Sequence, residues 1–302
     1  MKKILLLGGT GYIGTNLSLH LSATYDVTVT GRVKNNKILN ETKNINFLDF
    51  TLRNLSRMDE LINSFEVFVM LIPNTQPHYK IIDNNYDIEQ VVKPTQILFE
   101  KIAKSNKKVI FTSTGGAVYG NSNNLISGEK EPCIPLNRYG TLKLQLENHL
   151  LNLAETYELS ASVLRISNPY GGMFNGFFQT GFINQALYNV QNNTPINIWG
   201  DGTQIRDFIH ISDLCKYIMG AISLEGVQVI NIGTGKGNSL LEVVEKISEV
   251  YGKNIAVNFN PEYKEQVNFN VLDISKSLDL FKTSPSVDLI RGLQLEKSAY
   301  VV

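Results

Sequence analysis

The chain has 302 residues, of which 43% are hydrophobic and 19% charged, and its formal net charge is zero. This composition is typical of a globular protein with a large core, and the charge balance argues against a basic face for nucleic acid. The sequence has neither an apolar run that could span a bilayer nor a signal-peptide pattern, so we expect a cytoplasmic protein with no membrane partner. Cys133 and Cys215 should then be reduced thiols, and the four histidines show no spacing typical of a metal site.

The first half of the chain alternates between strand and helix patterns. The runs that predict strands are KKILLLG, YDVTVTG, NINFLDF, EVFVMLI, KKVIFTST and SASVLRIS. Several of these runs are continuously apolar, which is typical of strands buried on both faces. Helices are expected at 13–23, 87–105 and 136–157. This alternation predicts a doubly wound parallel sheet, a Rossmann-type α/β fold.

The second half of the chain has a different texture from Asn168 onward, where glycine, asparagine and phenylalanine become frequent. Helices are expected at 183–191 and 213–223, with the short strand INIWG between them. A further amphipathic helix begins after Asn238 or Ser239, either of which is a suitable N-cap.

The run VQVINIG at 227–233 predicts a late strand that returns to the main sheet. We therefore expect an N-terminal Rossmann domain at 1–167, joined by this late strand, and a smaller C-terminal lobe at 168–302.

A glycine-rich turn, LLLGGTGYIG, places Gly8, Gly11 and Gly14 at three-residue spacing between a predicted strand and a predicted helix. The first glycine forms the tight turn, the second lets the backbone approach a pyrophosphate, and the third lets the helix pack on the strand. The N-terminus of the helix favours the negative charge of the phosphates. The context predicts a dinucleotide site, and the alternative is a plain glycine turn in an α/β protein.

The second predicted strand ends in Gly31 and Arg32, without the acid that usually binds the adenosine ribose. Such an acid binds the 2′-hydroxyl of NAD, whereas an arginine accommodates the 2′-phosphate of NADP. The cofactor is therefore expected to be NADP or NAD, with NADP slightly favoured. In the alternative, Arg32 points to solvent or stacks on the adenine and NAD is bound.

Tyr139 and Lys143, in the run RYGTLKLQ, lie one helical turn apart and share a helix face. A nearby ammonium lowers the pKa of a tyrosine from about 10, so the tyrosine can exchange a proton with a sugar hydroxyl. Ser113 and Thr114, at the end of the preceding strand, offer a hydroxyl that could orient the substrate oxygen. The alternative is an ordinary packing pair, because the same face is otherwise apolar. It continues through Leu146, Leu150, Leu153 and Tyr157.

Five motifs in order, GGTGYIG, STGGAVYG, YGTLK, RISNPYG and GDGTQIRDFIHISDL, carry a resemblance to a known family. They resemble the extended short-chain dehydrogenases/reductases, specifically the nucleotide-sugar epimerases and dehydratases related to UDP-glucose 4-epimerase. The resemblance covers nearly the whole chain. It implies a nucleotide-diphosphate sugar as substrate, a substrate-binding role for the C-terminal lobe, and a homodimer formed through the helices at 87–105 and 136–157.

The resemblance also implies roles for individual residues. Tyr139 would be the acid and base, and Lys143 would bind the nicotinamide ribose and tune the tyrosine. Asn168 and Arg206 would bind the substrate, the arginine at its diphosphate. The residues implied in cofactor binding are Gly8, Gly11, Tyr12, Ile13, Gly14, Gly31, Arg32, Asp49, Phe50, Leu71 and Pro169.

Two of the neighbouring residues have a second interpretation. Arg206 could instead form a local ion pair with Asp207. Trp199 could line the nucleotide pocket or pack in the core.

The hydroxyl segment departs from the family pattern, because Gly115 stands at the usual catalytic position, four residues before Tyr119. We therefore assign the hydroxyl role to Thr114, with Ser113 second. A dehydratase would need an acid pair beside this hydroxyl, and two glycines follow Thr114, so dehydratase chemistry is not expected.

Two further segments depart from the pattern. Strand four ends in MLIPN, where Pro73 replaces the small residues usual beside the dinucleotide. Tyr263 or Lys264 stands near the position where relatives carry another phosphate-binding arginine.

Three functions follow from these features. The first is a nucleotide-sugar 4-epimerase that works through a 4-keto intermediate. The second is an NADPH-dependent reductase of a 4-keto-6-deoxy nucleotide sugar, which the arginine after strand two favours. The third is a dinucleotide-binding protein without catalysis, which the complete tyrosine, lysine and hydroxyl set disfavours.

Overall fold

A computed structural model of the chain describes residues 1–31, 39, 41–52, 54–72, 84–121, 126–172, 181–262 and 266–299. The chain forms two compact units. Unit 1 consists of Met1–Thr114, Arg138–Arg165 and Cys215–Ile230, and unit 2 consists of Gly115–Asn137, Ile166–Leu214 and Asn231–Val302. The predicted division at 167/168 lies two residues from the unit change after Arg165. The segment 115–137, which the sequence placed in the N-terminal domain, belongs with unit 2.

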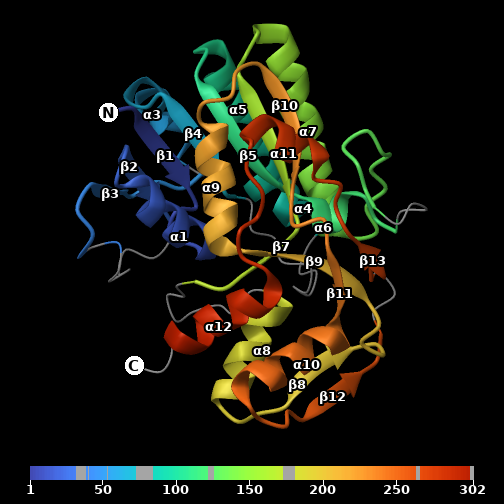
Figure 1. Cartoon of the computed structure of the whole chain (residues 1–302). Helices are drawn as coiled ribbons and strands as arrows, with labels where there is room; N and C mark the ends of the chain where they lie inside the picture. The colour runs from blue at the N-terminus through green and yellow to red at the C-terminus, as the bar shows by residue number, and fades with distance from the viewer. Residues whose placement is uncertain are drawn as a thin grey trace. The chain divides into compact units, whose positions relative to one another are not determined.

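Unit 1 is built on a seven-stranded sheet (Figure 1). Its strands, in spatial order, are β10 (Val227–Ile232), β6 (Ala161–Ile166), β5 (Lys108–Thr114), β4 (Val67–Met70), β1 (Lys3–Leu7), β2 (Asp26–Thr30) and β3 (Ile45–Leu48). The pairings of β1 with β2 and β4, of β2 with β3, and of β4 with β5 are parallel. The order 3-2-1-4-5-6 is that of the Rossmann fold, so the predicted fold class is confirmed, and β10 lies in this sheet beside β6.

The helices of unit 1 have apolar residues on the face that packs against the sheet. The bounds are α1 (Tyr12–Leu21), η1 (Leu55–Arg57), α3 (Met58–Ser64), α4 (Asn84–Asp87), the π-helical η2 (Ile88–Val92), α5 (Lys93–Lys104) and α7 (Arg138–Tyr157). Helices α3, α5 and α7 share one core with β1, β4 and β5, whose alternate residues Leu5, Leu7, Phe68, Met70 and Phe111 point into it. Figure 1 shows α5 and α7 side by side on the sheet.

The buried face of α7 differs in part from the predicted stripe. Its first two leucines are buried, but Leu153 is only partly buried and Tyr157 is exposed. The structure buries Glu147 and Ala154 instead. The reason is geometric, because positions spaced by seven drift by about 20° for every two turns of a straight helix.

Unit 2 contains two small sheets and the helices around them. The four-stranded sheet has β9 (Ile205–His210) in contact with β7 (Asn168–Tyr170), β11 (Gly237–Ser239) and β13 (Phe269–Asn270), and β8 (Ile196–Trp199) pairs with β12 (Val257–Asn260). Its helices are α6 (Gly115–Val118), α8 (Phe182–Gln191), α10 (Leu240–Tyr251), α11 (Ser275–Phe281) and α12 (Leu289–Ala299), while α9 (Ile211–Ala221) belongs to both units. Helices α8, α10 and α12 pack against the strands through a single apolar core.

Local capping explains the bounds of α10. Ser239 is the N-cap, and its hydroxyl accepts from the Glu242 N–H while the Glu242 carboxylate accepts from the Ser239 N–H. Gly252 ends the helix in the left-handed conformation with φ 64°. Of the two N-caps expected from the sequence, the structure selects Ser239.

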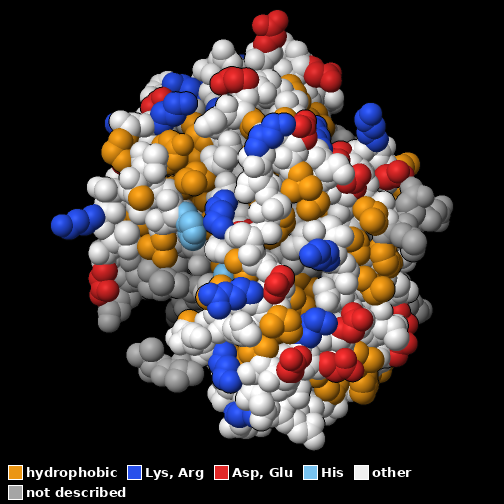
Figure 2. Space-filling view, viewed as in Figure 1, with side chains coloured by type: hydrophobic (Ala, Val, Ile, Leu, Met, Phe, Trp, Pro, Cys, Tyr) orange, Lys and Arg blue, Asp and Glu red, His pale blue; other side chains and the backbone are white. Residues whose placement is uncertain are grey.

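The surface seen in Figure 2 carries lysine and arginine side chains interspersed with aspartate and glutamate. This view shows no single-sign patch, in line with a net charge of zero. Within the described ranges, no helix is both long enough and apolar enough to cross a membrane. Cys133 and Cys215, both among the described residues, form no disulfide.

Candidate active site

The glycine-rich turn joins β1 to α1 in unit 1. Gly8 has φ 86°, a left-handed conformation that side chains disfavour. Gly11 is the N-cap of α1, and its N–H donates to the Gly8 carbonyl at 3.0 Å. A Cβ atom on Gly14 would lie 2.5 Å from the Gly9 Cα, so only glycine fits where the helix meets the turn. The bare backbone and the N-terminus of α1 together form a cradle that fits a pyrophosphate.

The end of β2 lies directly against this turn. A Cβ atom on Gly31 would lie 1.8 Å from the Thr10 hydroxyl oxygen and 2.7 Å from its Cβ. An acid at position 31 would therefore need Thr10 to move, which gives a steric reason for the missing carboxylate. Arg32 lies outside the described residues.

The other residues expected near the cofactor differ in their surroundings. Asp49 is exposed and its backbone carbonyl accepts from Arg57 at 3.0 Å. Phe50 is buried in the apolar core beneath it. Leu71 follows β4 and its N–H donates to the Leu7 carbonyl at 3.0 Å. Pro73, Tyr263 and Lys264 lie outside the described residues.

The structure brings Tyr139, Lys143 and Thr114 together in unit 1. A hydrogen bond joins the hydroxyls of Tyr139 and Thr114. The Lys143 ammonium lies 5.9 Å from the centre of the Tyr139 ring and 4.9 Å from that of Phe111. It donates to the Thr112 carbonyl at 2.8 Å. The first turn of α7 and the end of β5 thus supply one compact set of groups.

Burial controls the ionisation of this pair. Tyr139 keeps part of its surface exposed, but packing around its hydroxyl raises its pKa to about 12, against the opposing effect of the Thr114 hydrogen bond. Burial lowers the pKa of Lys143 to about 7, and the charge of Glu147 opposes this change. The tyrosine is therefore a phenol at neutral pH in this arrangement, and it would need further positive charge nearby to act as a base.

Ser113 has a different partner from Thr114. Its hydroxyl donates to the Oε1 atom of Glu147. The other oxygen of Glu147 accepts from Nε and Nη2 of Arg165 on β6, at 3.1 and 2.9 Å. Neither Glu147 nor Arg165 was predicted from the sequence to belong to the site. The available signal was the spacing, because Glu147 follows Lys143 by four residues on the same helix face.

Arg206 and Asp207 lie on β9 in unit 2 and do not pair with each other. The Asp207 carboxylate accepts from the N–H and hydroxyl of Thr234 at 2.8 and 2.7 Å, and from the Gly235 N–H at 3.1 Å. Arg206 donates only to the backbone carbonyls of Ile205 and Val267 within the described part of the chain. Burial without a carboxylate partner lowers the pKa of Arg206 to about 10. This guanidinium is suited to an anion.

Asn168 and Pro169 lie on β7, which pairs in parallel with β9. The side-chain nitrogen of Asn168 donates to the Asp207 carbonyl at 2.9 Å. The side chain is partly buried, and its amide oxygen takes no part in that hydrogen bond. Trp199, at the end of β8, is 40% exposed, so it does not pack in the core.

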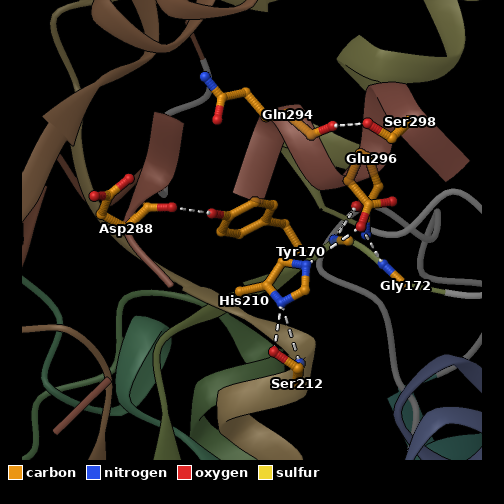
Figure 3. Close-up of polar contacts among 10 residues, drawn as sticks. Tyr170, Gly172, His210, Ser212, Asp288, Gln294, Glu296 and Ser298 are labelled. Carbon is orange, nitrogen blue, oxygen red and sulfur yellow. Dashed lines mark hydrogen bonds and ion pairs between the residues drawn. The ribbon is translucent and has the colours of Figure 1, made fainter. Parts of the chain in front are cut away.

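The end of β7 is held by a buried cluster in unit 2 (Figure 3). The Glu296 Oε1 atom on α12 accepts from the Gly172 N–H at 2.8 Å and lies 3.2 Å from His210 Nε2. On its other side, the His210 ring contacts Ser212 through Nδ1 at 2.7 Å. A Cβ atom on Gly171 would lie within 2.7 Å of both His210 and Glu296. Residues from β9 and α12 therefore fix Gly171 and Gly172, which follow β7.

The described residues include no group of three or more histidine, cysteine or acidic side chains placed to hold a metal ion.

Comparison with known proteins gives consistent results. A family model described as the NAD dependent epimerase/dehydratase family matches residues 4–233. A putative UDP-glucose 4-epimerase of Methanocaldococcus jannaschii is 30% identical over 295 residues, which are 96% of each chain. A dTDP-4-dehydro-6-deoxyglucose reductase of Escherichia coli is 28% identical, over 96% of this chain and 95% of the relative. The crystal structure of the UDP-glucose 4-epimerase of Thermotoga maritima with UDP-glucose matches with a TM-score of 0.90 and 26% identity, over 99% of this chain and 98% of that one.

Proposed function

This chain belongs to the NAD-dependent epimerase/dehydratase family, and from that premise we propose that it is a nucleotide-sugar 4-epimerase that works through a 4-keto intermediate. The carrying observation is the set of three groups in unit 1. The Tyr139 hydroxyl is bonded to Thr114, and the buried Lys143 ammonium lies 5.9 Å from the tyrosine ring. A proton-transfer group, a hydroxyl that orients it and a cation that tunes it are what this chemistry requires.

Each residue of the set has one proposed task. Thr114 orients the 4-hydroxyl of the sugar, and Tyr139 takes its proton in the oxidative half and returns it in the reductive half. A nicotinamide dinucleotide held by the cradle between β1 and α1 would supply the hydride acceptor and donor for C4 of the sugar, on either face in turn. Lys143 stabilises the phenolate that exists between the two proton transfers.

The proposed cofactor site is the cradle between β1 and α1, with Gly8, Gly11 and Gly14 at the pyrophosphate. The family description favours NAD, whereas Arg32 in the sequence favours NADP. We propose NADP or NAD, and the released dinucleotide of purified protein decides between them. Binding of NADPH at least tenfold tighter than NADH, about 1.4 kcal/mol, would assign Arg32 to the 2′-phosphate.

The proposed substrate is a nucleotide-diphosphate sugar. Arg206 supports this, because its partly buried guanidinium has backbone carbonyls as its partners among the described residues. A diphosphate would supply the missing negative charge. Asn168 is the proposed contact to the sugar or its phosphate, and Pro169 to the nicotinamide.

One observation favours a second function. The relative from Escherichia coli is named as a reductase of a 4-keto-6-deoxy sugar nucleotide. In that reaction Tyr139 acts only as the acid, and a phenol with a pKa raised to about 12 is protonated for that task. The same site would then consume NADPH with each turnover.

The two functions are separated by one experiment. The protein is incubated with UDP-glucose, UDP-galactose and UDP-N-acetylglucosamine, and the 4-epimers are followed by NMR. In parallel, dTDP-4-keto-6-deoxyglucose and NADPH are supplied and the loss of NADPH is followed by absorbance. Epimer formation without net cofactor consumption supports the first function, and stoichiometric NADPH loss supports the second. If neither reaction occurs although the wild-type protein binds dinucleotide, the third function, dinucleotide binding without catalysis, is supported.

We also propose a homodimer through α5 and α7. These helices lie side by side, and His149 on α7 is 3.6 Å from Glu100 on α5. Light scattering tests the assembly, and a monomer would contradict it.

A further inference from the structure

The end of β5 is attached to α7 residue by residue. Its last three residues each contact a different residue of α7. The pairs are Thr112 with Lys143, Ser113 with Glu147, and Thr114 with Tyr139. The outer two pairs contain the proposed catalytic groups, whereas the middle pair contains a carboxylate with no task so far.

Glu147 is fully buried, and both of its oxygens have partners. Ser113 donates to one oxygen and Arg165, itself 6% exposed, donates twice to the other. Burying such a pair in place of apolar side chains gives little or no stability, because desolvation offsets the attraction. Its value is therefore in orientation, since these hydrogen bonds tie the strand ends of β5 and β6 to one point on α7.

We propose that Glu147 is a positioning residue, whose carboxylate holds the end of β5 on α7 so that Thr114 stays bonded to Tyr139, and keeps a negative charge one turn from Lys143. The inference rests on the proposed function of Tyr139 and Thr114. Glu147 itself touches neither of them and acts through Ser113 and through charge.

The charged and titratable groups around Lys143 are few in the part of the chain that the structure describes. Tyr139 and Glu147 face it from α7, Arg165 on β6 reaches it through Glu147, and β5 contributes the Thr112 carbonyl. The charge of Glu147 raises the pKa of Lys143 against the effect of burial. Removing that charge should make the lysine lose its proton at lower pH.

The first test compares Glu147→Gln, Ser113→Ala and the double variant, by the kcat and KM of the wild-type reaction. A small misplacement of catalytic groups can cost about 100-fold, so we expect kcat to fall roughly 10- to 100-fold in each variant, with KM little changed. Because both residues act through one contact, the double variant should be no slower than the worse single one. Ser113→Thr keeps the hydroxyl and should restore the rate.

Several outcomes would overturn the proposal. They are an unchanged kcat in Glu147→Gln, losses that multiply in the double variant, or a failure of Ser113→Thr to restore the rate. If Glu147→Gln does not fold because Arg165 loses its partner, Glu147→Gln/Arg165→Met removes both charges and should fold with the same loss of kcat. A folded double variant with the wild-type rate would also overturn it.

The second test does not depend on turnover. The ε-methylene resonances of isotope-labelled lysine are followed against pH, and Lys143→Met assigns the one that titrates near pH 7. This pKa should fall in Glu147→Gln and stay unchanged in Asp213→Asn, a control that removes another buried carboxylate, bound to Ser286. An unmoved Lys143 in Glu147→Gln would refute the role of its charge. If no sugar nucleotide is turned over, the proposed function fails while this titration still reports on Glu147.

Discussion

Because of Lys143, the free energy of unfolding of the protein without bound cofactor should rise with pH above about pH 7. Its pKa is about 7 in the folded chain, against 10.5 for a free lysine. Between these values the unfolded chain holds a proton that the folded chain does not. Because the unfolded state binds more protons, the free energy of unfolding rises with pH across this range.

The size of the effect follows from the same two values. At about 1.4 kcal/mol for each pH unit, the full contribution is roughly 5 kcal/mol, reached above the pKa of the unfolded lysine. Between about pH 6 and pH 9, linkage gives roughly 2.5 kcal/mol. Lys143→Met keeps the length of the side chain and removes the charge, so this contribution should vanish in the variant.

The assay is urea unfolding of wild type and Lys143→Met at several pH values, followed by circular dichroism. The difference in the free energy of unfolding between the two proteins cancels the contributions of the other titrating groups. The amount by which wild type is less stable than the variant should shrink by roughly 2.5 kcal/mol between about pH 6 and pH 9. Lys93→Met, at a side chain 56% exposed, is the control and should give curves parallel to wild type. Parallel curves for Lys143→Met would refute the reasoning, since they would mean that the lysine is charged in both states.

Three further predictions concern binding and catalysis. Tyr139→Phe should lower kcat by about 100- to 10,000-fold, the usual value of acid–base catalysis, while dinucleotide binding measured by fluorescence stays; retention of the rate would remove the tyrosine from the chemistry. Arg206→Met should weaken UDP binding about 10- to 100-fold by calorimetry, because charged hydrogen bonds contribute about 1.5–3 kcal/mol; unchanged binding would place the diphosphate elsewhere. Gly14→Ala should abolish dinucleotide binding, because its Cβ would lie 2.5 Å from the Gly9 Cα, whereas Gly128→Ala, whose Cβ would have its nearest neighbour at 3.9 Å, should bind normally.

The sheet of unit 1 could be predicted because its strands are continuous apolar runs and its helices are long and periodic. The sequence analysis did not predict the strand β9, although its residues IRDFIH pair with β7, β11 and β13 in the four-stranded sheet of unit 2. Its polar residues are partly or wholly buried, and their partners lie far away in sequence, as Asp207 with Thr234 shows. A local sequence pattern carries no information about such partners. For the same reason, the sequence allowed an ion pair between Arg206 and Asp207 that the structure does not form.

The proposed catalytic groups could be found because Tyr139 and Lys143 are close in sequence and unusual on an apolar face. Glu147 could not be predicted as part of the site because a glutamate in a helix is normally exposed. Its partners come from two other strands, through Ser113 and Arg165, and only the folded chain brings them together. The preference for Thr114 over Ser113 came from the motif, and the structure adds that the two hydroxyls have different partners.

The link between Gly172 and Glu296 spans 124 positions, and this separation sets an order of events during synthesis. A ribosome that adds roughly 5–20 residues per second needs about 6–25 s to make the intervening chain. Throughout that interval the chain just beyond β7 lacks the carboxylate that accepts a hydrogen bond from the Gly172 N–H. The segment after β7, whose Asn168 is proposed to contact the sugar, is thus made well before α12, and this support for it forms only once α12 has been made.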